Sequence, residues 1–216
     1  MKYKFFICLW MILSLHSNCA SQLAIGVAPI MRFSDDRVGQ TYNLGIVGQL
    51  YEDSAIFTRI GFAASFPVYV NGTAQLDAFD SVTVPFTISI RARQKILDYI
   101  LHASGGVCIN PKKKKNSFVF TFGLRLVVRT VGVKYLETFD KNLYNTKPES
   151  RNPNIPAAIN IGFNLGLGYE IKFKRLLLFP EFSLGFGSAD YFGKHPWNSF
   201  PNYGEFGLGI MFVSKK

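Results

Sequence analysis

The strongest pattern in the chain is a strict alternation of apolar with small or polar residues. From Ala157 to Phe173 every second residue is apolar, mostly Ile, Leu or Phe, and the positions between them hold mainly Gly and Asn. A period of two predicts a β-strand, and about 17 residues is long for one. The intervening glycines argue against a helix, in which glycine is costly.

The same alternation recurs along the chain and predicts an all-β protein. Nine candidate strands begin near residues 22, 41, 54, 81, 97, 118, 157, 175 and 203. The segments that begin near 22 and 97 alternate less cleanly, and Lys95 to Leu101 is also compatible with one or two helical turns. Short turns are expected at Glu52–Asp53, Gln94–Lys95 and Lys174–Arg175.

The composition of the two phases favours a membrane barrel over a soluble sandwich or lipocalin-like barrel. A soluble sheet exposes many Lys, Glu and Thr, whereas here the second phase is mainly Gly, Ser, Asn and Ala with few charges. Small residues suit a narrow lumen, and Leu, Ile and Phe suit lipid contact. We therefore expect a closed antiparallel transmembrane β-barrel of the outer-membrane type, because only closed barrels pair every strand in lipid.

Topology limits the number of strands. If both termini lie in the periplasm, the number of strands must be even. In barrels of this type the short turns are periplasmic and the long loops are external. The segment 118–156 leaves two readings open. It forms either two strands, 118–128 and 131–137, which gives a ten-stranded barrel, or an external loop hairpin above an eight-stranded one. We expect eight, with a long irregular segment near 130–156.

The N-terminus has the features of a Sec signal peptide. Lys2 and Lys4 precede an apolar run from Phe5 to Leu15, which is too short to span a bilayer. Cleavage after Cys19, Ala20 or Ser21 is compatible with the sequence, as is lipid modification of Cys19. We expect residues 1–21 to be the signal peptide and 22–216 to form one barrel domain. The outer membrane of a Gram-negative bacterium is the expected location.

The chain is strongly basic although it is also hydrophobic. The chain has 24 Lys and Arg against 14 Asp and Glu, a formal net charge of +10, and yet its mean hydropathy is positive at +0.14. Some of the charge falls in the phase of the strands that faces the lumen. The simplest interpretation is a lattice of ion pairs, because buried charges need partners; a conducting path or gate is the alternative. The predicted lattice consists of Arg59, Arg91, Arg125, Arg129, Glu170, Lys172, Glu181 and Glu205.

The run Lys112–Lys115 is the one dense basic cluster. A solvated turn is its simplest interpretation. The sharper hypothesis is an external patch formed by Lys112, Lys113, Lys114 and Lys115 that binds lipopolysaccharide phosphates or the acidic surface of another envelope protein. Outer-membrane lipid is the other expected partner, and no nucleic-acid motif accompanies the run.

No catalytic constellation emerges from the sequence. His102 and His195 are the only histidines beyond the leader, and neither has a nucleophile at a recognisable spacing. The Gly-x-Gly pairs lie inside strands, so they predict no phosphate-binding loop. Asp35, Asp36, Asp77 and Asp80 do not match a calcium-loop spacing. We expect no enzyme activity, no cofactor and no metal.

Two regions carry a family resemblance. Val82 to Ile90 (VTVPFTISI) and Tyr99 to Gly106 (YILHASGG) resemble the "I-P-L-L-L-K-Y" and "Y-x-L-x-G-G" strands of the PorT-like outer-membrane β-barrel family. Gly166 to Glu170 and Leu178 to Gly187 are similar to its closing hairpin. The resemblance covers about residues 81–109 and 157–188. It implies an eight-stranded outer-membrane barrel, and some members of that family belong to the type IX secretion apparatus.

Two functions remain in view. The first is a non-catalytic integral outer-membrane barrel that scaffolds or assists envelope assembly or protein secretion. The second is a soluble secreted or periplasmic β-barrel that binds an apolar ligand. The two differ in which phase of the strands faces inward, since the Leu and Phe residues contact lipid in the first and line the interior in the second.

Overall fold

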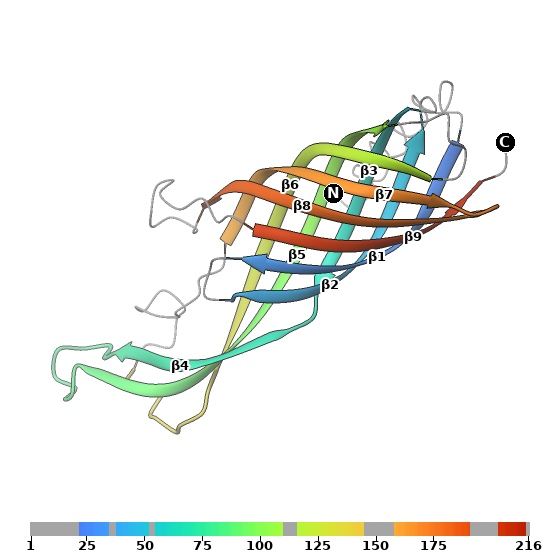
Figure 1. The fold of residues 1–216 in the computed structure, drawn as a ribbon. Coiled ribbons are helices and arrows are strands. Elements are labelled where there is room, and N and C mark those ends of the chain that lie inside the picture. The colour runs from blue at the N-terminus through green and yellow to red at the C-terminus, as the bar shows by residue number, and fades with distance from the viewer. Residues whose placement is uncertain are drawn as a thin grey trace, which may run out of the picture.

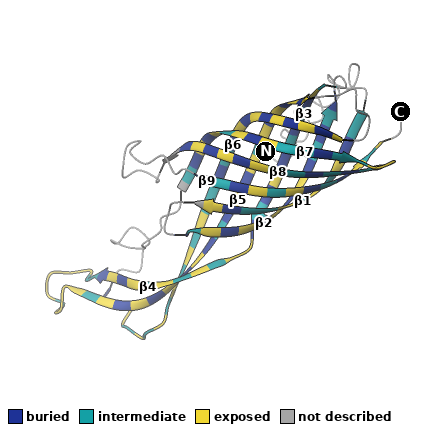
Figure 2. Ribbon diagram, in the orientation of Figure 1, coloured by how far each residue is buried: buried dark blue, intermediate teal, exposed yellow. Residues whose placement is uncertain are grey.

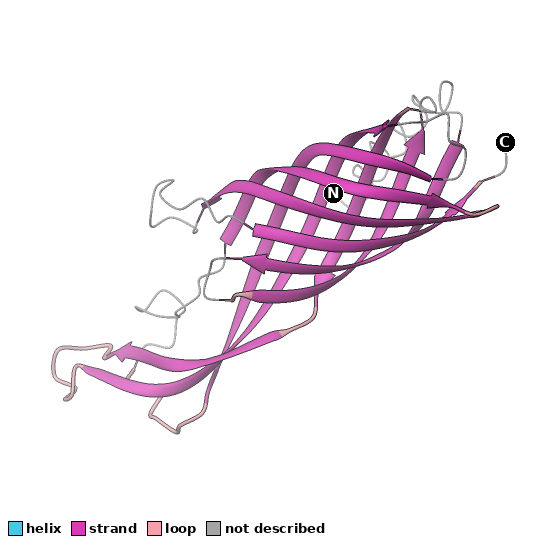
Figure 3. Ribbon diagram, viewed as in Figure 1, coloured by secondary structure: helices cyan, strands magenta, loops and turns pink. Residues whose placement is uncertain are grey.

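The computed structural model describes residues 22–34, 38–51, 55–109, 116–144, 158–190 and 203–214. These residues form one antiparallel sheet of long strands (Figures 1 and 3). No helix long and apolar enough to cross a membrane occurs in this part of the chain. The strands are β1 Gln22–Ser34, β2 Gln40–Tyr51, β3 Ile56–Ser65, β4 Val68–Asp77, β5 Thr87–Ile109, β6 Asn116–Tyr135, β7 Ala158–Lys172, β8 Leu176–Asp190 and β9 Tyr203–Val213.

The sheet closes into an eight-stranded barrel. The strand order is β3-β2-β1-β9-β8-β7-β6-β5-β4, and an additional pairing joins β3 to β5. Ile56 lies opposite Val107, and Ala64 lies opposite Tyr99, so β3 and β5 complete the ring. The prediction of a closed antiparallel barrel with eight strands is confirmed. The ten-stranded alternative is wrong, because β6 runs without interruption through residues 118–135.

The ninth strand belongs to an extension of the sheet beyond the barrel. The first half of β5, Thr87–Ile96, pairs with β4, whereas its second half pairs with β3. On the other side of β5, the pairing with β6 continues as far as Ala92 and Tyr135. We call this three-stranded part, built from Val68–Asp77, Thr87–Ile96 and Val131–Tyr135, the extension. It projects from one end of the barrel (Figure 1).

The extension corrects several predictions from the sequence. Gln94–Lys95 is not a turn but lies inside the 23 residues of β5. The strands expected near 81 and 97 are therefore one strand, which begins at Thr87, and residues 81–86 lie in the connection before it. β4 was not predicted. Residues 130–135 belong to β6, so the irregular segment begins only at Leu136.

The chain directions separate the two ends of the barrel. The first described residue, the end of β9 and the β7–β8 hairpin lie at one end, and the extension lies at the other (Figure 1). The predicted two-residue turn at Lys174–Arg175 is confirmed by the reciprocal backbone hydrogen bonds of Phe173 and Leu176, 2.7 and 3.3 Å. The topology rule for such barrels predicts that the end with Gln22 and Val213 faces the periplasm and that the extension is external. Glu52–Asp53 and the predicted signal peptide, 1–21, lie outside the described residues.

The apolar phase of the strands faces outward. Along β7 the exposed residues Ile161, Phe163, Leu165 and Leu167 alternate with buried or half-buried Gly and Asn, and the same checkered pattern covers the barrel in Figure 2. Large exposed hydrophobic residues occur on every barrel strand. A soluble protein does not expose apolar surface on this scale, whereas a barrel in lipid must.

Inward glycines make room for the large side chains that fill the lumen. A Cβ atom added at Gly106 would overlap the ring of Phe57, and one at Gly185 would overlap the ring of Tyr203. Both rings are almost fully buried. The frequent Gly of the second phase is thus a packing requirement of a narrow barrel, whose interior is filled by side chains.

Candidate functional site: the barrel interior

Seven of the eight residues predicted to form the lumen lattice lie in the barrel and point inward. They take part in ion pairs, of which Arg59–Glu181 and Arg125–Glu205 link strands that are not neighbours in the sheet. Arg59 pairs with Glu181, Arg125 with Glu205, and Lys172 with Glu170 at 3.2 Å. Arg129 pairs instead with Asp98, which was not among the predicted residues.

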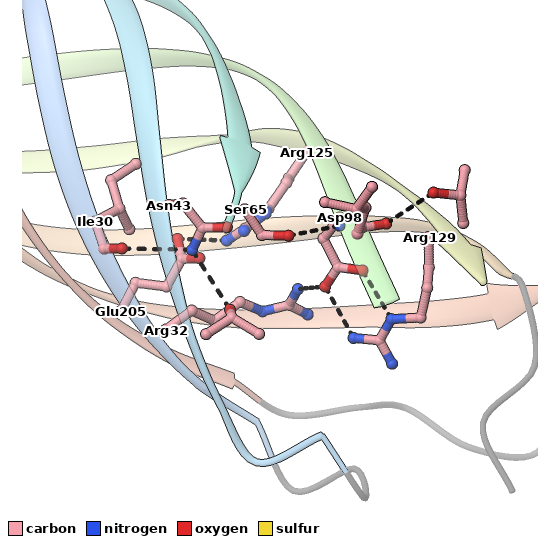
Figure 4. A network of polar contacts seen from close by, with 11 residues as sticks. Ile30, Arg32, Asn43, Ser65, Asp98, Arg125, Arg129 and Glu205 are labelled. Atoms are coloured by element: carbon pink, nitrogen blue, oxygen red, sulfur yellow. Dashed lines mark hydrogen bonds and ion pairs between the residues drawn. The ribbon is translucent and has the colours of Figure 1, made fainter. Parts of the chain in front are cut away.

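Asp98 organises the external half of the lumen (Figure 4). Its carboxylate accepts hydrogen bonds from Arg32 at 3.2 Å and from two nitrogens of Arg129 at 2.8 and 2.9 Å. Its backbone N–H donates to the Ser65 hydroxyl at 2.8 Å. The carboxylate is fully buried, so these two guanidinium groups supply the compensation that a buried charge requires.

Glu170 organises the half of the lumen near the termini. Gln49 and Tyr51 donate to the same carboxylate oxygen at 2.7 and 2.8 Å, and Lys172 approaches the other oxygen. The Gln49 carbonyl oxygen in turn accepts hydrogen bonds from two nitrogens of Arg59, at 2.9 and 2.7 Å. Gln49 therefore links the Glu170 cluster to the Arg59–Glu181 pair.

The pairs Arg59–Glu181 and Arg125–Glu205 face a cavity of about 80 Å³ between the two halves. Aromatic rings hold both arginines from the side. The guanidinium carbon of Arg59 lies 3.7 Å from the ring centre of Phe179, and that of Arg125 lies 4.3 Å from the ring centre of Tyr203. His102 also lines the cavity, beside Gly61, and no described nucleophile contacts it through a hydrogen bond. A cavity of this size has room for a few water molecules but not for a continuous pore.

Arg91 is the predicted lattice residue that the structure places elsewhere. It lies on the extension with its side chain 75% exposed, and it pairs with Glu137 at 2.5 Å. The Glu137 carboxylate also accepts a hydrogen bond from the Arg91 backbone N–H at 3.0 Å. These hydrogen bonds lower the pKa of Glu137 below its usual value. The prediction that Arg91 lines the lumen is wrong, because its part of β5 has left the barrel.

The members of the network that sequence reasoning missed include Arg32, Asp98 and Gln49. Arg32 and Asp98 lie in the two segments whose alternation was least clean, so neither could be assigned to a face. Gln49 is fully buried and was visible in the inward phase of its strand, but an uncharged residue gave no reason to select it.

The remaining predicted positions lie outside the described residues. Lys112–Lys115 fall between β5 and β6, and His195 falls between β8 and β9. The flanking strand ends, Ile109 and Asn116, lie at the barrel end that carries the termini. That end is the one expected to face the periplasm, not the external medium that the lipopolysaccharide hypothesis for these lysines requires.

The charged side chains of the interior are arranged in ion pairs. Five basic and four acidic side chains meet there in ion pairs, so opposite charges nearly balance. The soluble-barrel alternative required an apolar interior. The structure instead places these ion pairs inside, beside a smaller apolar cluster that includes Phe57, Leu177 and Met211, while most Leu, Ile and Phe side chains face outward.

Comparisons with known proteins agree with this fold. Neisserial surface protein A has a TM-score of 0.52 at 9% identity, and the match covers 88% of this chain and 96% of that one. Weaker similarities include the attachment invasion locus protein of Yersinia pestis with a heparin analogue, sucrose octasulfate (TM-score 0.47, 10% identity, 89% and 97% covered). Another is a major outer membrane protein from Thermus thermophilus (TM-score 0.47, 14% identity, 89% and 99% covered). No family model matches, and no curated protein sequence does.

The closed barrel, its lipid-compatible outer surface and its polar interior define an integral β-barrel protein of the outer membrane. The similarity to neisserial surface protein A shows the same fold. The narrower resemblance to the PorT-like family, which no family model bears out, stays a prediction.

Proposed function

We propose that this protein is a non-catalytic barrel that anchors an external β-sheet platform in the outer membrane, where it assists envelope assembly or protein secretion. The observation that carries the proposal is the extension. A barrel that only had to span the membrane could end its strands at the rim, yet β4, β5 and β6 continue beyond it.

The edge of the extension supports a role in binding a partner. Within the described residues β4 pairs along its length only with β5, so its outer edge presents unpaired backbone groups. Exposed edge strands of this kind accept an added strand from another chain. The edge carries neither Pro nor Lys, the residues with which proteins commonly protect such edges. This edge is the surface on which we place partner docking.

The filled lumen supports the non-catalytic and non-conducting part of the proposal. Its charged groups are paired across the barrel, and an eight-stranded barrel leaves no open channel. The PorT-like resemblance of residues 81–109 and 157–188 is the reason to name secretion among the assembly processes.

A shortened variant tests the proposal. Val68 and Ile96 lie opposite each other, so joining them through an Asn-Gly turn removes the β4–β5 part of the extension at a register that a two-residue hairpin accepts. Cells that produce this variant should keep the barrel at wild-type level in the outer-membrane fraction but lose secreted protein or envelope integrity. A matched control replaces Asn71 and Thr73 on the exposed face with Ser, which leaves the β4 backbone edge intact. Unchanged secretion and envelope integrity in the shortened variant would contradict the platform role.

A further inference from the structure

The outer face of the extension carries a basic cluster at the level where the barrel leaves the lipid. Three exposed cations, Arg93, Lys95 and Lys134, share this face on two neighbouring strands. We call these three residues the basic face. No ion pair involves any of them within the described residues; Arg93 only donates a hydrogen bond to Asn71, at 3.0 Å.

Two of these cations lie directly opposite each other on neighbouring strands. Arg93 and Lys134 are direct cross-strand partners, with side chains on the same face of the sheet. Like charges in this arrangement are destabilising, with Cβ atoms about 5 Å apart. A pair of this kind is stabilised when an anion lies between the two side chains. The geometry suits a phosphate group, which both cations can contact at once.

The position of the basic face selects the source of the phosphate. Residues of odd number in β5 point outward all along the strand, so Lys95 and Arg93 continue the line of the lipid-facing Leu101 and Tyr99. Exposed aromatic residues mark the rim at this point: Tyr42, Phe66, Tyr69 and Tyr99. Aromatic girdles lie at the membrane interface. Lys95 lies four residues beyond Tyr99, about 13 Å along the strand, and thus at headgroup level.

The opposite face of the extension is already occupied. Tyr144 packs there against Leu76 and Ile90, and its hydroxyl donates to the Pro85 carbonyl at 3.0 Å. The basic face is therefore the side of the extension on which the described residues leave an open charged surface.

We propose that the basic face binds the phosphate groups of lipopolysaccharide in the outer leaflet, and so holds the extension against the membrane surface. The inference rests on the external orientation that the proposed function assumes. Its chemistry is charge complementarity between cations on neighbouring strands and the lipid A phosphates, which lie in the headgroup layer beyond the aromatic rim.

The test uses the chain from residue 22 onward, folded in detergent micelles and titrated with purified lipid A. The double substitution Arg93→Gln and Lys134→Gln should weaken binding about thirtyfold, since each cation near an anionic surface contributes roughly 1 kcal/mol. The matched control is Lys174→Gln with Arg175→Gln, which removes the same charge from the exposed turn at the opposite end. The control should bind like the wild type, and all three proteins should show the same heat-modifiable migration on a gel.

Several results would overturn the inference. The first is unchanged binding of lipid A by the Arg93/Lys134 variant, and the second is an equal loss of binding in the Lys174/Arg175 control. The third is a wild-type protein that binds dephosphorylated lipid A or phosphatidylglycerol as tightly as lipid A. Failure of the proposed function gives a different signature, because secretion and envelope integrity in the shortened variant report it without reference to lipid A. If that variant loses secretion while the wild type ignores lipid A, only the present inference fails.

Discussion

At the scale of single residues, the barrel interior depends on pairs whose members stabilise each other only while both are present. Arg125 and Glu205 are nearly fully buried, and they come from strands β6 and β9, which are not neighbours in the sheet. Such a pair fixes the relative position of opposite walls. Replacing both members with apolar residues is often tolerated, but removal of one leaves an uncompensated buried charge.

We therefore expect Glu205→Gln to lower the free energy of unfolding by about 3 kcal/mol, the lower part of the range for breaking a buried pair, because the adjacent cavity admits water. Denaturant titration of the barrel in lipid vesicles measures this. The exposed pair supplies the control, since Glu137→Gln should have a much smaller effect. Equal effects of the two substitutions would contradict the interpretation of the lumen as a set of buried, interdependent pairs.

Gly185 tests the packing side of the same argument. In Gly185→Ala the new methyl group overlaps the Tyr203 ring. The ring must therefore shift from its present position, where the guanidinium carbons of Arg32 and Arg125 lie 4.8 and 4.3 Å from its centre. We expect a loss of about 1–3 kcal/mol, typical of overpacking. Gly204→Ala is the control, because a Cβ there would lie at an ordinary 3.8 Å from Phe182. The same denaturant titration compares them, and equal stability would show that the ring moves at no cost.

At the scale of elements, β5 shows where the alternation of apolar and polar residues stops predicting a strand. Inside the membrane its outward residues are apolar, and beyond the rim they become Lys95, Arg93 and Arg91. Because this part of β5 is surrounded by water and not by lipid, its residues 91–95 are mostly polar, and the sequence there resembles a turn. Asn71-Gly72 inside β4 is likewise a typical turn signal. Most barrel strands and their faces could be predicted because lipid imposes one rule on all of them; the exceptions were the segments of Arg32 and Asp98, where the alternation is less clean. The extension could not be predicted, since outside the bilayer that rule no longer applies.

The ion pair of the extension gives a prediction on pH. Hydrogen bonds from Arg91 lower the pKa of Glu137, so the folded state binds this proton more weakly than the unfolded state does. The stabilisation is complete above the usual carboxyl pKa of 4.5 and is lost as the pH falls through the lower folded value. Amide hydrogen exchange at Arg91, whose N–H donates to Glu137, should therefore accelerate at acidic pH after correction for intrinsic rates. The Glu137→Gln variant should lack this dependence, and a persisting dependence would assign it to another group.

At the scale of the whole molecule, the sheet performs two tasks with one set of strands. Its closed part exposes Leu, Ile and Phe to lipid and pairs its charges inside, while the extension of β4, β5 and β6 carries cations on its outer face. The sequence predicted most members of the lumen lattice because inward charges stood out among Gly and Asn. It could not predict which of these charges would pair. Arg125 on β6 and Glu205 on β9, for example, come together only when the sheet closes into a ring.

Closure of the ring also predicts the electrical behaviour of the molecule. The pairs Arg59–Glu181 and Arg125–Glu205 border the same cavity, and together they obstruct the lumen between its two halves. The wild-type protein in a planar lipid bilayer should therefore show no steady single-channel current.

Replacing all four residues with Ser removes the charges in matched pairs and much of the side-chain volume. Water can then join the two halves of the lumen, and small ion currents should appear. Heat-modifiable migration on a gel must first show that this variant folds. A second, less perturbed variant replaces only one pair, Arg59→Ser with Glu181→Ser, and should have intermediate conductance. Steady current through the wild-type protein would instead identify the interior as a conducting path, and folded variants as silent as the wild type would place the obstruction elsewhere in the lumen.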